Sequence, residues 1–404
     1  MPQQARGSNA RIAFGEETNW GETPTSPSTT LLKAATYGVN LGGNMEEITS
    51  EAITDARALE NARGGNIDVS GSIPIEVPIA GFGTLLKHAM GSVTTGQNAV
   101  PPDSPAITGV EILYAEQGAT DGDGTLDFVA SSTELTWSAP SDTAGPAVDV
   151  SAGGDFTLES GSTGEALTVR VDAASLPGSD ASDTITVESR YRHRLTRGDL
   201  PTGLFIEVGF TDIGKYIVFN GCKINSLSFT VANSGIITGS LEVMGRDYTI
   251  SDTEVATPAT VDHTPLVHHE ASVLVDEATS KVQNLEMTIN NNLNGDAYVI
   301  GDRYRDQLNE GQGQASGSIT VQFRDQTWLD RWSNETEFSL ATNFVNSLGE
   351  LGIEYPRCKL FENAVPALET AQGIVQSMSL RPLRSNDGDN SDVVFDLIND
   401  QATI

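Results

Sequence analysis

Three aspartates near the middle of the chain could do metal chemistry. Asp121, Asp123 and Asp127 are spaced so that their carboxylates could surround a hard cation such as Ca²⁺. The segment lacks the later bidentate glutamate of a calcium loop, and its Asp-Gly pairs also favour a turn between strands. We therefore predict no resident metal and keep these three aspartates as the weak candidates for one.

A second group of possible ligands contains the histidines His263, His268 and His269, with Asp262 and Glu270 beside them. Imidazole and carboxylate groups together can bind a transition metal, but this spacing matches no known zinc arrangement. The pattern favours histidines on a surface or in a linker.

Catalytic motifs are missing from the sequence. There is no Gly-x-Ser-x-Gly elbow, no phosphate-binding glycine loop with its lysine, and no nucleophile with an obvious base. Carboxylates are abundant, so counting them leaves glycosidase chemistry open. Cys222 and Cys358 lie more than a hundred residues apart and indicate neither a disulfide framework nor a zinc site. We predict no enzyme activity, no catalytic residue and no cofactor.

The charge balance restricts the partners. The 404 residues include 23 Lys and Arg against 55 Asp and Glu, a formal net charge of -32. Such a surface does not bind nucleic acid by neutralising phosphates, and DNA that meets it should be repelled. We see no apolar run of membrane-span length and no export signal, and we expect no membrane contact.

One segment is densely basic. Residues 191–197 hold Arg192, Arg194 and Arg197 together with His193. Nucleic-acid binding is one interpretation of such a run. We favour ion pairs with acidic groups across a subunit boundary.

Glycine, proline, serine and threonine are frequent, and alternating apolar and polar residues predict short antiparallel strands, as in 65–77. Residues 1–30 are predicted to form an extended arm that a partner orders. The segments 46–65 and 290–313 should project from the sheet, and short helices are expected at 82–90, ended by Gly91, and from Thr327.

A compositional break separates residues 106–189, which contain fifteen acidic residues against one basic residue, Arg170. Alternating runs with Gly, Ser, Pro and Asp turns predict an inserted Ig-like or similar small β-sandwich here. The expected organisation is an arm at 1–30, a discontinuous domain at 31–105 and 190–404, and the insert at 106–189.

Several strand pairs echo one another. Residues 223–231 with 238–243 resemble 281–289 with 316–323, and 374–380 with 393–397 repeat the theme more weakly. The start Ser70-Gly71-Ser72-Ile73 has the same pattern as Ser316-Gly317-Ser318-Ile319. This repetition indicates a sheet built from similar antiparallel units, each a predicted pair of strands.

The segments 81–91, 219–227 and 235–245 resemble the siphophage tail tube, or major tail, proteins. The resemblance covers roughly 30–100 and 190–404. It implies a mainly β fold of two packed antiparallel sheets with a short flanking helix. It also implies rings, commonly hexameric, whose inner strands join into one β-barrel lumen and which stack through a long loop and the terminal arms.

From this resemblance we expect a structural subunit of a non-contractile phage tail that conducts DNA during ejection without binding it specifically. It would be made in the host cytoplasm and assemble with itself and with the tape measure, terminator and distal tail proteins. The inner tube of a contractile tail or phage-derived bacteriocin, a carbohydrate-binding or adhesive multi-β protein, and an enzyme with a β-sandwich domain are the alternatives. The predicted inter-ring or inter-subunit contacts are Glu46, Glu47, Arg63, Asn294, Arg303, Tyr304 and Arg305.

Overall fold

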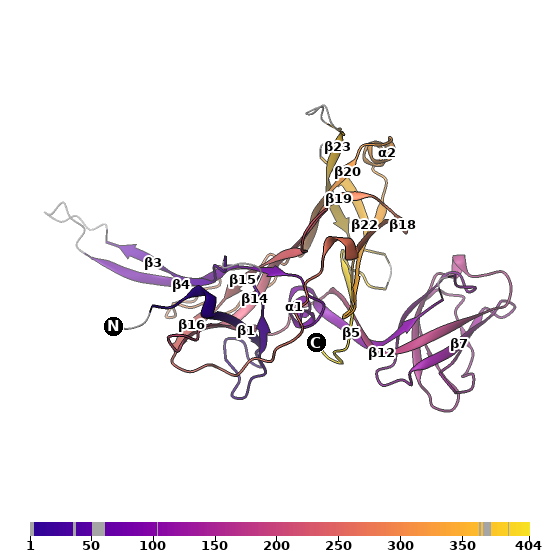
Figure 1. Ribbon diagram of the computed structural model, residues 1–404, viewed down its shortest axis with the longest axis horizontal. Coiled ribbons are helices and arrows are strands. Elements are labelled where there is room, and N and C mark those ends of the chain that lie inside the picture. Colours follow the sequence, from indigo (N-terminus) through magenta and orange to yellow (C-terminus); the bar gives the residue numbers. More distant parts are fainter. Residues whose placement is uncertain are drawn as a thin grey trace.

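The computed structural model describes residues 4–34, 38–50, 61–102, 104–362, 365–366, 373–386 and 388–404. The protein is mainly β and almost all of its strands are joined into antiparallel sheets, as predicted. Figure 1 shows an elongated molecule with a long hairpin at one end and a separate group of strands at the other. We call this group, formed by residues 110–187, the β body. No helix in the described ranges is both long and apolar enough to cross a bilayer.

One antiparallel sheet gathers the first strands of the chain and three later ones. Its order is β2-β1-β13-β14-β16. The strands are β1 Ala10–Glu16, β2 Thr30–Leu32, β13 Leu204–Phe210, β14 Lys215–Ala232 and β16 Asp247–Ser251.

A second run of strands continues from the C-terminal half of β14. Its order is β3-β4-β15-β14-β19-β20-β23-β22. The further strands are β3 Gly42–Thr49, β4 Ala62–Glu76, β15 Thr238–Gly245, β19 Val282–Asn290, β20 Gln314–Gln322, β22 Gly349–Phe361 and β23 Val375–Leu383.

β22 links this run to a third group of strands on the other side of the core. Here the order is β18-β17-β21-β22-β24-β12-β5. The strands are β5 Gly91–Val100, β12 Ala181–Arg197, β17 Ala271–Val275, β18 Ala278–Thr279, β21 Phe338–Asn346 and β24 Val394–Asn399.

The main core lies between these layers and contains residues of all three groups of strands. Phe229 on β14 approaches Phe395 on β24 with ring centroids 5.8 Å apart, and Phe82 meets Phe229 edge-on at 6.1 Å. Apolar residues alternate with polar ones along these strands because successive side chains of a strand point to opposite faces. Two packed antiparallel sheets are therefore confirmed.

Both predicted helices are present. The helix α1 Gly83–Met90 ends at Gly91, whose φ of 95° is a conformation that glycine adopts easily, and α2 Thr327–Ser333 follows β20. The described part of the chain also contains three short 3-10 helices, Gly7–Asn9, Ala173–Ser175 and His268–Glu270.

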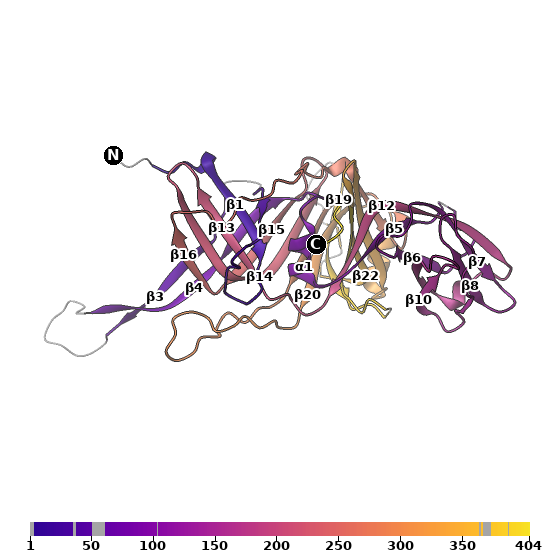
Figure 2. The same ribbon diagram turned by 90° about the horizontal axis from the view of Figure 1, so that it is seen from below.

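A second, separate hydrophobic core is centred on Trp137 and Leu158. It lies in the β body at the end of the molecule in Figures 1 and 2. The core also takes in Ala99 on β5, before the predicted start at residue 106. The predicted boundaries and Ig-like type stay predictions. The strands between β5 and β12 are β6 Val110–Ala115, β7 Gly122–Val129, β8 Glu134–Ser138, β9 Val148–Asp149, β10 Gly154–Glu159 and β11 Ala166–Val171.

Two sequence expectations were wrong. Residues 10–16 are not part of a free arm, because β1 pairs along its whole length with β13 and buries Phe14. The last of the echoing strand pairs is not a pair in the structure either. β23 pairs with β20 and β22, whereas β24 pairs with β12 and β22.

Candidate functional site: a hydroxyl face, a docked loop and an arginine junction

Six neighbouring strands present small polar side chains on the side away from the core. In register, Thr238 pairs with Thr230, Thr230 with Glu286, and Glu286 with Ser318, which is followed by Ser379 on β23. We call this surface the hydroxyl face. Its members are Ser72, Glu76, Ser226, Ser228, Thr230, Thr238, Ser240, Glu242, Asn284, Glu286, Thr288, Asn290, Gln314, Ser316, Ser318, Thr320, Ser377 and Ser379.

The hydroxyl face is acidic or neutral over its whole width. Glu76, Glu242 and Glu286 are its charged members, and the Ser318 hydroxyl donates to Glu286 at 3.3 Å. The cations nearest to it are Lys223, whose ammonium is 2.9 Å from Glu310, and the cross-strand neighbours Arg381 on β23 and Lys359 on β22, of which Lys359 lies 3.7 Å from Glu337. The eighteen members of the hydroxyl face therefore offer phosphates only neutral hydrogen-bond donors, with the cations confined to its margins.

The long hairpin of β3 and β4 projects from the molecule, as Figures 1 and 2 show. The prediction that 46–65 projects therefore holds for its described residues, although strands form much of it; residues 51–60 lie outside the described ranges. Glu46, Glu47 and Arg63 are exposed on this hairpin, where Glu47 pairs with Gly64 and Ile48 with Arg63.

The second predicted projection, 290–313, packs against the base of the same hairpin. Arg303 donates through Nε to the Gly65 carbonyl at 2.9 Å, and the Ile67 amide donates to the Arg303 carbonyl at 2.8 Å. Tyr304 is half-buried against the main core, and Asn294 is exposed. The loop is thus held to β4.

Arg305 is the residue that fastens this loop. It is 3% exposed, donates to the carbonyls of Val69 at 2.9 Å and Gly245 at 2.8 Å, and pairs with Asp68. Its guanidinium also lies over the Tyr298 ring, 5.5 Å from the centroid. A side chain so enclosed cannot make the direct contact with another subunit that we predicted for it.

Where β12 meets the β body, arginines and carboxylates form an ion-pair network. The Asp389 carboxylate accepts from Arg170 on β11 and from Arg194 on β12, each at 2.8 Å. Arg194 also pairs with Asp396 at 2.9 Å and with Glu111 on β6 at 3.3 Å. The two guanidinium groups hold the pKa of Asp389 well below its usual value, and Asp389 raises the pKa of Arg170.

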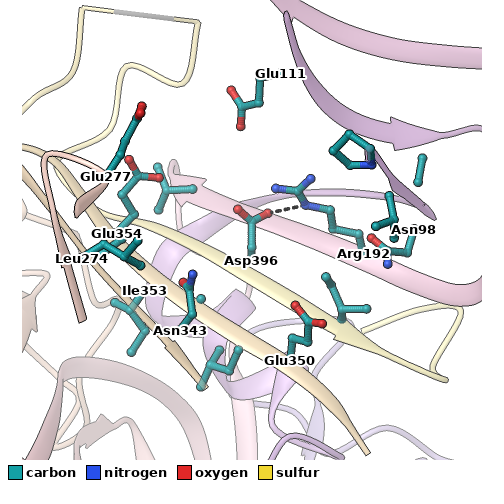
Figure 3. Close-up of a pocket in the computed structure, with 18 of the residues that line it drawn as sticks. Asn98, Glu111, Arg192, Leu274, Glu277, Asn343, Glu350, Ile353, Glu354 and Asp396 are labelled. Atoms are coloured by element: carbon teal, nitrogen blue, oxygen red, sulfur yellow. Dashed lines mark hydrogen bonds and ion pairs between the residues drawn. The ribbon is translucent and has the colours of Figure 1, made fainter. Parts of the chain in front are cut away.

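Arg192 completes this arginine junction, which we define as Glu111, Arg170, Arg192, Arg194, Asp389 and Asp396. Its Nε donates to Asp396 at 2.9 Å, the dashed contact in Figure 3, and Nη1 donates to the Ile112 and Leu113 carbonyls. Glu277, Glu350 and Glu354 line the same cavity of about 420 Å³. The predicted pairing of the basic run across a subunit boundary was wrong for these arginines, because their acidic partners lie in the same chain.

The candidate metal ligands are not brought together. Asp121 accepts from the Gln97 amide at 2.6 Å, Asp123 accepts from the Thr186 hydroxyl at 2.8 Å, and Asp127 follows on β7. Within the described ranges, no three or more His, Cys, Asp or Glu side chains are grouped as metal ligands would be.

The polar face of a broad curved sheet, free edges and a projecting hairpin are features of a subunit that assembles through its strands. A profile of the phage tail tube proteins matches residues 7–382. The chain belongs to the phage tail tube protein family. No curated protein matches it. This tail tube protein is therefore a structural subunit of the virion tail that assembles into a tube with other tail components.

Sequence reasoning identified the alternation of these strands but did not assign the hydroxyl face. The signal was present, because Ser226, Ser228 and Thr230 alternate with buried Leu227 and Phe229. The acidic partners of the arginine junction were missed for another reason. Glu111 and Asp389 are far from β12 in sequence, and only the fold brings them together.

Proposed function

We propose that this tail tube protein forms the hollow tube of a non-contractile phage tail and that the hydroxyl face lines its bore. The observation that carries the proposal is the continuous polar surface over six strands, with glutamates as its charged members. Phosphates passing such a wall meet no cationic row to which they could bind. DNA would then move through the tube without a specific contact.

The position of the β body relative to the hydroxyl face supports a tail without a sheath. Phe395 points into the core, so its neighbour Asp396 points outward, where it contacts Arg192 and Arg194 of the arginine junction. The hydroxyl face lies across the core from this point. In a tube lined by the hydroxyl face, the β body would lie on the outside, where a close-fitting sheath would collide with it.

The remaining partners follow from this role. We propose that a tape measure protein occupies the bore during assembly and that terminator and distal tail proteins cover the two tube ends, with assembly in the host cytoplasm. Exposed Glu46, Glu47, Arg63 and Asn294 remain candidates for contacts between rings or between subunits of one ring. The subunit would act as a passive conduit and not as an enzyme.

Electron microscopy of the negatively stained, purified chain over a range of concentrations tests this function. We expect hollow rings or tubes with knobs on the outer surface. Persistent monomers, or filaments without a bore, would contradict it.

A further inference from the structure

Two parts of the chain contain the same succession of elements. The first unit is β1, β2, β3, β4, α1, β13, β14, β15 and β16, and the second is β17, β18, β19, β20, α2, β21, β22, β23 and β24. Read in chain order, each strand or helix of the first unit has a counterpart in the second. Figure 1 shows the two helices beside different parts of the sheet.

The strand pairings repeat as well. In the first unit β14 pairs with β13, β15 and β16, and in the second β22 pairs with β21, β23 and β24. β4 lies between β3 and β15 as β20 lies between β19 and β23. β1 pairs with β2 and β13 as β17 pairs with β18 and β21. Agreement of so many strand pairings in the same chain order indicates that the two units share one topology.

The cysteines show that the match extends to single residues. Leu204 opposes Cys222, and after a bulge Ile206 opposes Phe219. In the second unit Phe338 opposes Cys358, and after the same bulge Leu340 opposes Tyr355. Both thiols are fully buried, and both cysteines are followed by lysine and an aliphatic residue. The two cysteines of the chain therefore occupy equivalent positions.

The Ser-Gly-Ser-Ile motifs agree with the same alignment. Gly71 opposes Val243 and Gly317 opposes Leu380, so the motif on β4 and the motif on β20 occupy equivalent places. The sequence echo was real, but its repeat unit is a whole sandwich with a helix and not a single hairpin.

We propose that the chain is a tandem duplication and that three copies, not six, close one ring of the tube. This inference rests on the proposed function. Each chain supplies eight strands to the inner wall, namely β3, β4, β15, β14, β19, β20, β23 and the end of β22. The segment from β5 to β12 interrupts the first unit alone, because residues 334–337 join α2 directly to β21. One ring would then contain six tube units but three outer β bodies.

The geometry of closed sheets favours three chains. With strands about 4.8 Å apart and tilted by about 35–45°, about 24 strands give a backbone diameter of about 45–52 Å. Side chains that reach about 5 Å inward from each wall leave a bore that passes one hydrated duplex. Six chains would give about 90–104 Å, wide enough for several duplexes, and two would give about 30–35 Å, which leaves little space for water.

The junction between the two units provides a template for the contact between chains. Within the chain, β14 of the first unit pairs with β19 of the second over Ser226–Ala232. With Cys222 aligned to Cys358, Phe361 corresponds to Asn225, whose carbonyl accepts from the Asn291 amide. The equivalent contact therefore begins at the end of β22 in one chain and joins it to β3 of the next. Both are free edges among the described residues, since β3 pairs with β4 and the β21 pairing of β22 stops at Cys358.

Exposed apolar side chains mark both edges of this predicted contact. Met45 and Ile48 on β3 are 55% and 53% exposed, and Phe361 at the end of β22 is 46% exposed. Open strand edges that carry apolar residues favour pairing with another strand. A second copy of this chain presents the complementary edge.

Native mass measurement and top-view electron microscopy of assembled rings test the inference. A chain weighs 42.8 kDa, so a ring should weigh about 128 kDa and show three knobs. Six knobs and about 257 kDa, or any other count, would overturn the three-chain ring and leave the tube function standing. A chain that never forms rings at any concentration would overturn both.

A pair of variants tests the contact itself. Phe361→Asp should raise the concentration needed for ring formation at least tenfold without changing the melting temperature, because Phe361 is exposed in the free chain. Val129→Asp is the control, since Val129 is 36% exposed on β7 in the β body. Assembly of Phe361→Asp at the wild-type concentration would contradict the proposed edge.

Discussion

The hydroxyl face and the arginine junction show two ways in which one sheet sandwich uses its polar side chains. On the hydroxyl face the side chains are short, and its glutamates lack arginine or lysine partners among the described ion pairs. At the arginine junction, long cationic side chains are largely buried, Arg194 most of all, and are shared among Glu111, Asp389 and Asp396. The first arrangement leaves nothing for a polyanion to bind, and the second fixes one body against another.

Lysines introduced on the hydroxyl face should have the largest effect on DNA retention. They would give this surface the cationic side chains that now distinguish the arginine junction from it. In the triple variant Thr230→Lys, Ser240→Lys, Ser318→Lys, assembled tubes should retain short duplex DNA at low salt roughly tenfold more strongly than wild type. Retention should fall steeply as salt rises. A sedimentation assay on tubes with labelled duplex measures this.

The matched control places the same change on the β body. Ser182, Thr184 and Thr186 are exposed on one face of β12, and their replacement by lysine leaves an acidic neighbourhood. Tubes of this variant should retain DNA no better than wild type. Equal retention by both triple variants would mean that DNA binds to the added lysines wherever they lie, and would contradict a bore lined by the hydroxyl face.

Removal of one carboxylate from the arginine junction should have the next largest effect. Asp389→Ala removes the carboxylate that Arg170 and Arg194 share, leaving Arg170 with Asp155 and Arg194 with Glu111 and Asp396. The lost charge-assisted hydrogen bonds should lower the free energy of unfolding by about 1.5–3 kcal/mol. Asp400→Ala is the control, because Asp400 is 85% exposed and lies 3.7 Å from Arg190, an arrangement worth at most about 0.5 kcal/mol. Urea denaturation of both variants measures these free energies of unfolding. Equal values for the two variants would contradict a stabilising role of the arginine junction.

The pH dependence of the arginine junction should be smaller. The pKa of Asp389 lies below its usual value of 3.8, so its contribution is present above about pH 4 and is lost as the pH falls through the folded-state pKa. The stability difference between wild type and Asp389→Asn should therefore be constant from pH 8 to about 5 and shrink below pH 4. A difference that grows on acidification would contradict the ion-pair assignment.

Excision of the β body should have the smallest effect on assembly. Val100 and Thr186 are paired neighbours on β5 and β12, so an Asn-Gly turn can replace residues 101–185. We expect hollow tubes of normal bore without knobs, at a concentration close to that of wild type. A variant that folds, as judged by circular dichroism, but forms no tubes would show that the β body takes part in assembly.

Local pattern sufficed for much of the fold. The alternation of Leu227, Phe229 and Val231 with small polar residues predicts a strand with one buried face, and Gly91 ends α1 where the sequence indicates. These features depend on residues next to one another in the chain, so a single sequence carries them.

What the sequence did not show depends on distant residues. Phe14 is buried only because β1 finds β13 almost two hundred residues later, so its segment looked like a free arm. The basic run similarly found its partners at Glu111 and Asp389 in its own chain. Pattern alone does not distinguish a partner in the same chain from one in another subunit.

A cryo-electron microscopy reconstruction of the assembled tube would show directly which surface of the subunit lines the bore. We predict that Ser228, Thr288 and Ser318 face the bore and that the β body, held by Asp389 and Arg194, points outward. A map in which the hydroxyl face lies on the outer surface or at an interface between rings, away from the bore, would contradict it.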